Sequence, residues 1–294
     1  MRIPLGRRFD VVGVGECCVD EVWRLDGVIV SGAKLRGRVE RRGGGQVATM
    51  LAASARLGLR VAFAGAVGDD EDGQVALASL VDEGVAIDAV RVEGSTRRAL
   101  VLVDRDGERT VVESVDPSVT RHDAAPSVSA ARVVHLDATS LPASLAAARA
   151  AREVGAMVSL DLDGVPGPEL DALLALTDLC VFSAGLEPPE SAILTRLQSR
   201  LAPGALCGYT AGMRGSGILS ATGERFDQPA FEVPVVDTTA CGDTFRAGLV
   251  LALLNGDDLP RALETASAAA ALKCRDIGRA GCPTLAGLNT FLKR

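Results

Sequence analysis

The sequence predicts an α/β fold in which a mainly parallel central sheet carries helices on both faces, accompanied by a small separate β-sheet. The first observation is an alternation of apolar strand-like runs with Ala-rich helical runs in the middle of the chain. These runs lie at 132–137, 143–154, 156–162, 169–176 and 179–182. Alternation at this spacing is typical of strand–helix–strand units with parallel strands.

The second observation is a hairpin signal at Asp106-Gly107, between strand-like runs at 97–104 and 108–114. Further strand-like runs lie near 18–25 and 34–42, where apolar and polar residues alternate. Paired together, these runs predict a small sheet standing off the main body, contributed by about 18–42 and 95–115.

Composition limits the class of protein. The chain has 294 residues, 48% of them hydrophobic and only 3% aromatic, with a net charge of −7. Since no long basic block occurs, nucleic-acid binding is disfavoured. No apolar run approaches the ~20 residues of a membrane span. The seven cysteines are scattered without a Cys-x-x-Cys, and the two histidines have no ligand spacing, so we expect reduced thiols, a cytoplasmic protein and no zinc site.

The N-terminal part begins with a strand that enters a glycine turn at 11–15. A dinucleotide-binding fingerprint is incomplete, because Cys18 stands where its third glycine belongs, so a nicotinamide dehydrogenase is a poor alternative. Asp20 follows, either as a ligand-binding carboxylate or as a solvated strand-end charge. Next comes Gly43-Gly44-Gly45-Gln46 and an Ala-rich helix at 47–57, closed by Gly58. A strand at 60–67, an acidic turn and a helix at 74–83 complete this part.

Polar side chains follow the predicted parallel strands. Asp137, Asp161, Asp163 and Ser183 all fall at carboxyl ends, where ligands bind in open α/β sheets. A carboxylate there can orient hydrated Mg²⁺ or cap the next helix. His135 is expected to be a packed strand residue.

The most informative stretch is Val236-Asp237-Thr238-Thr239-Ala240-Cys241-Gly242-Asp243-Thr244-Phe245. It lies between a predicted short strand at 231–235 and an apolar helical run at 247–254. A loop of small residues at a helix start can direct several N–H groups at one point, which makes an anion site. Asp243 is then either an acidic residue of the first turn or a general base beside a transferring phosphoryl group. A helix at 265–273, a turn at 274–282 and a last helix at 284–292 follow.

Three motifs together resemble the ribokinase-like (PfkB) carbohydrate kinases. The family motif Asp-Thr-x-Gly-Ala-Gly-Asp is written here Asp237-Thr238-Thr239-Ala240-Cys241-Gly242-Asp243. The family's Gly-Gly turn before a helix ending Ala-Arg-Leu-Gly is matched by Gly44-Gly45 and Ala55-Arg56-Leu57-Gly58. Its Thr-x-Gly-x-x-Gly occurs at 210–215. The resemblance runs from about Asp10 to Leu292.

The resemblance implies one ribokinase-like kinase domain over 1–294, with the small sheet as a lid over the sugar and as a homodimer interface. It implies ATP-dependent phosphorylation of a hydroxyl of a small sugar, with Mg²⁺. By resemblance the catalytic residues are Asp243 as base and Ala240, Cys241 and Gly242 as anion hole. Implied substrate-binding residues are Asp20, Gly44, Gly45, Gln46, Thr49 and Asp243. Implied nucleotide-binding residues are Thr210, Gly212, Arg214, Gly215, Thr239, Gly242 and Asn255.

Departures from the family pattern concern the substrate and the metal. Many relatives have Asn where Thr49 stands, and the family's Asn-x-x-Glu is replaced by Ser183-Ala184-Gly185-Leu186-Glu187. Glu187 and Asp161 are the metal candidates. Asp237 and Thr239, with carbonyls of 274–282, are candidates for a monovalent cation such as K⁺. A nucleoside or other non-sugar kinase of the same fold, and a catalytically silent binding homologue, remain alternatives.

Overall fold

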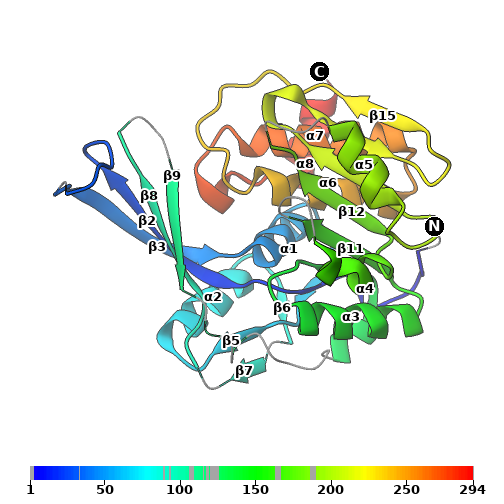
Figure 1. Ribbon diagram of the computed structural model, residues 1–294, viewed down its shortest axis with the longest axis horizontal. Helices are drawn as coiled ribbons and strands as arrows, with labels where there is room; N and C mark the ends of the chain where they lie inside the picture. Colours follow the sequence, from blue (N-terminus) through cyan, green and yellow to red (C-terminus); the bar gives the residue numbers. More distant parts are fainter. Residues whose placement is uncertain are drawn as a thin grey trace.

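The structure, a computed structural model, consists of a large central sheet between two layers of helices and a small sheet that projects from one side (Figure 1). It describes residues 3–32, 34–88, 90–92, 94–105, 109–114, 116, 119, 126–162, 167–185 and 190–293.

The central sheet has nine strands in the order β15-β14-β13-β12-β11-β10-β1-β4-β6. The strands from β6 to β13 run parallel to their neighbours, and β14 and β15 continue the sheet antiparallel. The predicted mainly parallel sheet is therefore confirmed. The strands are β1 (Phe9–Val14), β4 (Val61–Phe63), β6 (Ala86–Ile87), β10 (Ala131–Leu136), β11 (Met157–Leu162), β12 (Leu179–Ser183), β13 (Leu206–Thr210), β14 (Ser216–Leu219) and β15 (Arg225–Gln228).

Helices cover both faces of this sheet because successive strand residues alternate between two apolar cores. Val11, Val133 and Met157 face one core, whereas the next residue of each strand faces the other. The first core is closed by α1 (Gln46–Arg56), α2 (Glu71–Val81), α6 (Cys241–Asn255), α7 (Leu259–Lys273) and α8 (Leu285–Leu292). The second is closed by α3 (Leu141–Glu153), α4 (Asp171–Leu174) and α5 (Glu190–Gln198).

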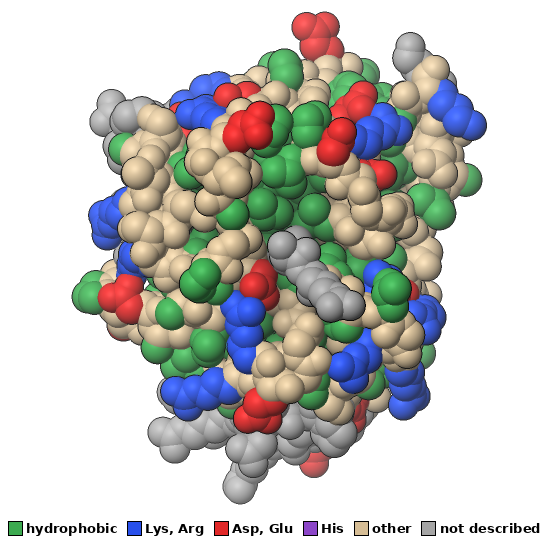
Figure 2. All heavy atoms as spheres, turned by 90° about the vertical axis from the view of Figure 1, so that its right-hand side faces the viewer, with side chains coloured by type: hydrophobic (Ala, Val, Ile, Leu, Met, Phe, Trp, Pro, Cys, Tyr) green, Lys and Arg blue, Asp and Glu red, His purple; other side chains and the backbone are tan. Residues whose placement is uncertain are grey.

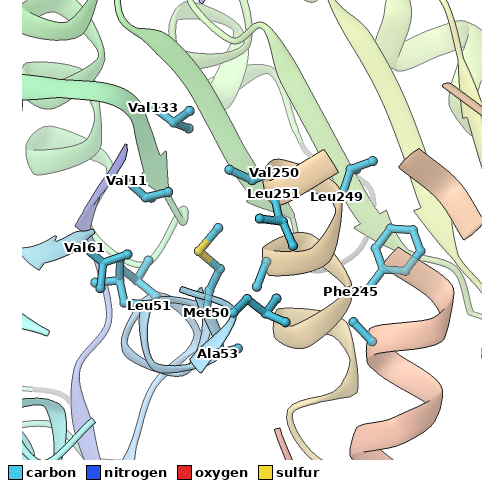
Figure 3. Packing of buried hydrophobic residues seen from close by; sticks show 14 of the residues in the cluster. Val11, Met50, Leu51, Ala53, Val61, Val133, Phe245, Leu249, Val250 and Leu251 are labelled. Carbon is cyan, nitrogen blue, oxygen red and sulfur yellow. The ribbon is translucent and has the colours of Figure 1, made fainter. Parts of the chain in front are cut away.

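Helices α1 and α6 pack side by side in the first core. Figure 3 shows Met50 and Ala53 of α1 facing Val250 and Leu251 of α6. Both helices therefore cover the same face of the sheet, and each is preceded by a turn of small residues, Gly43–Gly45 before α1 and Ala240 before α6.

The small sheet has the order β3-β2-β8-β9 and stands away from the main body on the left of Figure 1. Its strands are β2 (Cys18–Leu25), β3 (Gly37–Gly44), β8 (Arg98–Val103) and β9 (Arg109–Ser114). The predicted strand pairing is confirmed, although Asp106-Gly107 lies outside the described residues. Among the described residues there are also short 3₁₀ helices, η1 (Pro126–Ala130), η2 (Pro168–Leu170), η3 (Gly212–Arg214) and η4 (Gly278–Gly281).

Two predicted strands differ from the structure. The run at 60–67 is not one strand: β4 stays in the central sheet, whereas β5 (Ala66–Gly68) pairs with β7 (Val90–Val92). The chain leaves the sheet at Gly65, where a Cβ would collide with the ring of Phe63. The predicted strand at 231–235 is wrong, because Pro234 has no N–H to donate to a ladder and the chain is instead fixed by Val236 N–H to the Cys274 carbonyl at 2.7 Å.

On the face shown in Figure 2, acidic and basic side chains are interspersed around hydrophobic ones. Within the ranges that the structure describes, no helix combines the length and the apolar character that crossing a membrane requires.

Candidate active site

The loop before α6 makes a left-handed turn at the start of the helix. Ala240, the N-cap of α6, has a φ of 65° in the left-handed region, and among described residues no other non-glycine has a positive φ. This turn directs the chain into the helix. The first helical hydrogen bond runs from Thr244 N–H to the Ala240 carbonyl at 3.0 Å. Among the described residues no hydrogen bond is seen from the amides of Ala240 and Gly242, whereas Cys241 N–H donates to the Thr238 carbonyl at 3.3 Å. Amides at a helix N-terminus, together with the helix dipole, favour a bound phosphate.

Asp243 lies beside these amides in the first turn of α6. Its side chain is only 17% exposed, and Oδ1 lies 3.9 Å from Nη1 of Arg246 one turn further along. The carboxylate therefore keeps a limited opening to solvent while a buried cation holds its other side. This is an arrangement that a general base requires, because the acceptor atom must be both accessible and fixed.

Arg246 is a residue of this site that sequence reasoning missed. It is 3% exposed, forms an ion pair with Asp161 at the end of β11, and donates to the Val181 carbonyl of β12 at 3.3 Å. A Cβ at Gly242 would lie 2.8 Å from Arg246 Nη1, so a larger residue there would force this guanidinium to shift. Arg246 thus fastens the start of α6 to the carboxyl edge of the sheet.

The glycine turn at the start of α1 brings together the predicted sugar-binding residues. A Cβ at Gly44 would collide with the Asp20 carboxylate. Gly45 has a φ of 98°, and a Cβ at this position would clash with the Glu16 backbone. Gln46 N–H opens α1 and points to Glu16 Oε2 at 3.4 Å. The structure therefore brings four of the predicted residues close together: Asp20, Gly44, Gly45 and Gln46. Thr49, one turn into α1, is 6% exposed.

A hollow lies next to this turn, at the carboxyl ends of β1 and β10. Glu16 and Arg97 line it, and Arg97 Nε lies 2.9 Å from Glu16 Oε1. Burial raises the pKa of Glu16 to about 7, helped by the Asp137 carboxylate and opposed by Arg97. Sequence reasoning missed Glu16 and Arg97. The signal that marks Glu16 is its position directly after the Gly-x-Gly that ends the first strand.

The predicted phosphate turn at 210–215 lies at the carboxyl edge of β13. Gly212 has a φ of 55° and Gly215 a φ of 90°, and a Cβ at Gly215 would collide with the Gln228 carbonyl. The Thr210 carbonyl accepts a hydrogen bond from Ala184 N–H at 2.8 Å. Arg214 is held by Glu190 at 2.7 Å and by the Gly185 carbonyl at 2.8 Å. The turn therefore lies at the same sheet edge as the anion loop.

Asn255 is not brought to this site. It ends α6 at the opposite end from the anion loop, and a helix of this length spans about 20 Å at 1.5 Å per residue. The neighbouring Leu254 carbonyl accepts from Arg132, which lies at the amino end of β10. Asn255 therefore lies at the amino edge of the sheet, away from the anion loop. An Asn-Gly at a helix end is equally typical of a C-cap.

Asp237 precedes the anion loop and is fixed on several sides. Oδ1 accepts Thr239 N–H at 2.8 Å and Oδ2 accepts Gly278 N–H at 2.7 Å. Lys273 Nζ lies 3.5 Å from Oδ2. Burial raises the pKa of Asp237, but these two hydrogen bonds and the Lys273 charge outweigh burial and lower the pKa to about 2. The oxygen atoms predicted to hold K⁺ thus have an ammonium group among them.

For Mg²⁺ the described residues offer few carboxylates. No group of three or more His, Cys, Asp or Glu side chains among them has the geometry of a metal site. Asp161 is 2% exposed and already paired with Arg246. Glu187 lies outside the described residues. A Mg²⁺ ion that arrives with nucleotide phosphates and keeps its waters is compatible with this donor set.

Known proteins resemble this chain along almost its whole length. The family model for pfkB family carbohydrate kinase matches residues 9–285. The ATP-dependent ribose-1-phosphate kinase of Halopiger xanaduensis is 31% identical, over 96% of this chain and 97% of its own length. The fructokinase of Klebsiella pneumoniae is 32% identical, over 79% of this chain and 84% of its own. The structure of Arabidopsis thaliana ribokinase complexed with ribose and ATP has the same fold, with a TM-score of 0.85 at 23% identity, covering 97% of this chain and 99% of that one.

Proposed function

The chain belongs to the pfkB family of carbohydrate kinases, and from that membership we propose that it transfers the γ-phosphoryl group of ATP to a sugar hydroxyl held between the Gly44-Gly45-Gln46 turn and the anion loop. It is an ATP-dependent phosphotransferase with an alcohol group of a small sugar as acceptor. The observation that carries the site assignment is the amide-lined loop at Ala240–Gly242 with the Asp243 carboxylate beside it.

In the proposed reaction Asp243 accepts the hydroxyl proton as the sugar oxygen attacks phosphorus. The amides of Ala240, Cys241 and Gly242 stabilise the charge on the transferred group, which is the main contribution that a protein makes to phosphoryl transfer. Arg246 holds the first turn of α6 in place. The turn at Thr210–Gly215, with Thr239, lies along the nucleotide phosphates.

Mg²⁺ is part of this proposal, since it would supply positive charge to the phosphates of the bound nucleotide. The nucleotide and water supply most of its ligands, as is usual for this ion. Asp161 and Glu187 are the side chains predicted to orient its waters. At Asp161 this role would be shared with the ion pair to Arg246.

The small sheet is proposed to act as a lid, with residues 1–294 as one kinase domain. Asp20 on β2 pairs in register with Arg42 on β3, and its carboxylate lies against Gly44. The face of the sheet that carries Asp20 is therefore turned toward the glycine turn. A lid that closes over the sugar would exclude water, which competes as a phosphoryl acceptor. We also propose a cytoplasmic location, supported by seven cysteines that are all thiols in the structure.

A coupled ADP-release screen tests the function. The panel contains ribose 1-phosphate, ribose, fructose, aldohexoses, sugar acids and nucleosides, so that it covers the sugar classes of the relatives and the nucleoside alternative. ADP release that depends on a sugar supports the proposal. ADP release with nucleosides alone, or with no compound, would overturn it.

Asp243→Asn tests the assignment of the base. The amide keeps the shape of the side chain but cannot take the hydroxyl proton, so kcat should fall by roughly 10²–10⁴ while KM changes little. Steady-state kinetics on the best sugar of the screen measure this. Asp82→Asn is the matched control at an exposed carboxylate outside the site. A variant with nearly wild-type kcat would contradict the role of Asp243.

A further inference from the structure

Lys273 is a fully buried lysine at the end of α7. The chain contains three lysines, Lys34, Lys273 and Lys293. Lys273 is 0% exposed, whereas the other two are exposed. Burying an ammonium group is costly unless it is paired and hydrogen-bonded, so the protein must supply oxygen atoms to it.

Three oxygen atoms surround the buried ammonium. Nζ donates to the Asp237 carbonyl at 2.9 Å and to the Asp276 carbonyl at 3.1 Å, and it lies 3.5 Å from Asp237 Oδ2. Carbonyl and carboxylate oxygens are the donors that hard cations take in proteins. These are also atoms of the two segments, Asp237–Thr239 and 274–282, that the sequence marks as candidate donors for a monovalent cation.

K⁺ and the ammonium group cannot share these donors. Two unit positive charges at contact distance repel by about 4 kcal/mol even at an effective dielectric constant of 20. The residues present therefore do not fit a K⁺ ion, because the chain places its own cation among the oxygens.

We propose that Lys273 is a positioning residue that replaces a bound monovalent cation, so that the kinase needs no K⁺ for activity. This inference rests on the proposed function for its kinetic consequence, but its structural consequence does not depend on the substrate. It concerns the loop that must present its amides to the transferred phosphoryl group.

The contacts of Asp237 show how the charge reaches that loop. Lys273 fixes both the carbonyl and the carboxylate of Asp237, and the carboxylate accepts Thr239 N–H, directly before Ala240. The other carboxylate oxygen accepts Gly278 N–H and so ties η4 to the same point. Loss of the charge would release the segments on both sides of the anion loop.

A lysine in the last turn of a helix also has an ordinary structural explanation, since it complements the helix dipole. The two explanations differ in one respect. A dipole partner is not replaced by a free ion, whereas an ammonium held by converging oxygens leaves a cation site when the side chain is shortened.

The experiment compares Lys273→Ala, which leaves space among the oxygens, with Lys273→Met, which fills the same space with an uncharged chain. Lys293→Ala is the surface control. Melting temperature is measured in choline chloride, NaCl, KCl and NH₄Cl at constant ionic strength, with no substrate present. Initial rates of ADP release with ribose 1-phosphate, ribose and fructose are measured in the same salts.

The wild type and Lys293→Ala should melt and react alike in choline chloride and KCl. Lys273→Ala should lose activity by about tenfold or more, the scale of a charged hydrogen bond, and regain both activity and melting temperature as KCl or NH₄Cl rises to saturation. Lys273→Met should not be rescued. If no sugar supports ADP release, the function fails but the melting measurement still decides the cation site.

Two outcomes would overturn the inference. The first is a wild-type enzyme that KCl activates several-fold, which shows that a separate K⁺ is needed. The second is a Lys273→Ala variant that KCl and NH₄Cl leave unchanged. If neither Lys273 variant folds, the wild-type comparison alone still decides whether K⁺ is required.

Discussion

At the scale of single residues, one thiol of the anion loop touches a thiol at the end of α7. Cys241, the first residue of α6, and Cys274, directly after α7, have their sulfur atoms 3.0 Å apart, and both residues are half-buried. The Cys241 thiol and the nearby Lys273 charge lower the pKa of Cys274. Cys274 is therefore the more reactive thiol of the pair.

This pair predicts reversible inactivation by hydrogen peroxide. The Cys274 thiolate attacks one peroxide oxygen and expels hydroxide, which takes a proton from solvent to become water. The Cys241 thiol then attacks the sulfenic sulfur, and its proton leaves with the sulfenic hydroxyl as a second water. The new bond of about 2.05 Å draws the sulfurs about 1 Å closer. Because Cys241 belongs to the anion loop, closing this bond should disturb the position of its amide, and activity should fall.

Activity before and after peroxide, and again after dithiothreitol, measures the effect, and peptide mass spectrometry identifies the Cys241–Cys274 link. Cys241→Ala restores the residue that the family motif has here and should resist peroxide. Equal sensitivity of this variant, or a loss that dithiothreitol does not reverse, would refute the prediction.

His135 gives a second residue-scale prediction. It is 0% exposed on β10, with Nδ1 3.1 Å from Ser159 Oγ. Burial, and then the Arg246 charge, lower the pKa of His135 from 6.5 to about 3. Above pH 6.5 both folded and unfolded states are neutral at this residue. As pH falls from there toward the folded pKa, only the unfolded state gains a proton, so stability is lost.

The wild type should therefore lose about 2 kcal/mol between pH 7 and pH 5 relative to His135→Gln, at about 1.4 kcal/mol per pKa unit. Urea unfolding of both proteins across this range gives the difference in the free energy of unfolding. Parallel pH profiles would show that His135 contributes nothing to acid sensitivity.

The residues that sequence reasoning found and those it missed differ in how they act. Asp243, Gly44 and Gly45 belong to contiguous motifs, and each has a local conformational reason to be where it is. Arg246, Arg97 and Lys273 act through partners that are far away in sequence: Asp161, Glu16 and Asp237 respectively. Their partners become known only when the fold brings them together.

At the scale of elements, α6 is held to the sheet by one buried ion pair. Arg246 and Asp161 are 3% and 2% exposed. Breaking such a pair by removing one partner leaves an uncompensated buried charge. Arg246→Met should therefore lower the free energy of unfolding by about 3–5 kcal/mol, and activity should fall with it because the first turn of α6 loses its anchor.

The double variant Arg246→Met/Asp161→Leu separates charge from packing. It removes both charges and should be more stable than Arg246→Met alone, since paired buried charges can be replaced by apolar groups at little cost. Urea unfolding measures both proteins. The effect of Asp161→Leu alone is measured in the wild type for comparison. If the double variant is less stable than Arg246→Met by that same amount, the two residues are not coupled.

Elements with a strong local pattern were predictable, and elements that depend on tertiary contacts were not. The Ala-rich helix α1 and the strands of the small sheet follow periodicity and turn signals. The division of 60–67 into β4 and β5 depends on the crowding of Gly65 against Phe63. The absence of a strand at 231–235 follows from Pro234 and from the bond between Val236 and Cys274, a contact between distant segments.

At the scale of the whole molecule, the projecting sheet carries a partly exposed apolar row. Val39, Trp23 and Leu102 lie opposite one another on β3, β2 and β8, and therefore on one face. Val39 is 48% exposed, and Val112 of β9, on the same face, is 55% exposed. An apolar patch on a sheet that stands away from the body is typical of a protein–protein contact. This row supports the proposed homodimer through the small sheet.

Trp23→Glu should convert that dimer to a monomer. The change places a charge at the centre of the row in each copy, and burying a large apolar side chain contributes about 1.5–3 kcal/mol per copy. Light scattering during size-exclusion chromatography measures the mass of both proteins. Leu5→Glu, at a residue that is 82% exposed and lies elsewhere on the chain, is the matched control. Two results would contradict the small sheet as the interface: a wild type that remains monomeric as its concentration rises, and a Trp23→Glu variant with the mass of a dimer. The proposed role of the sheet as a lid would then be tested by kinetics alone.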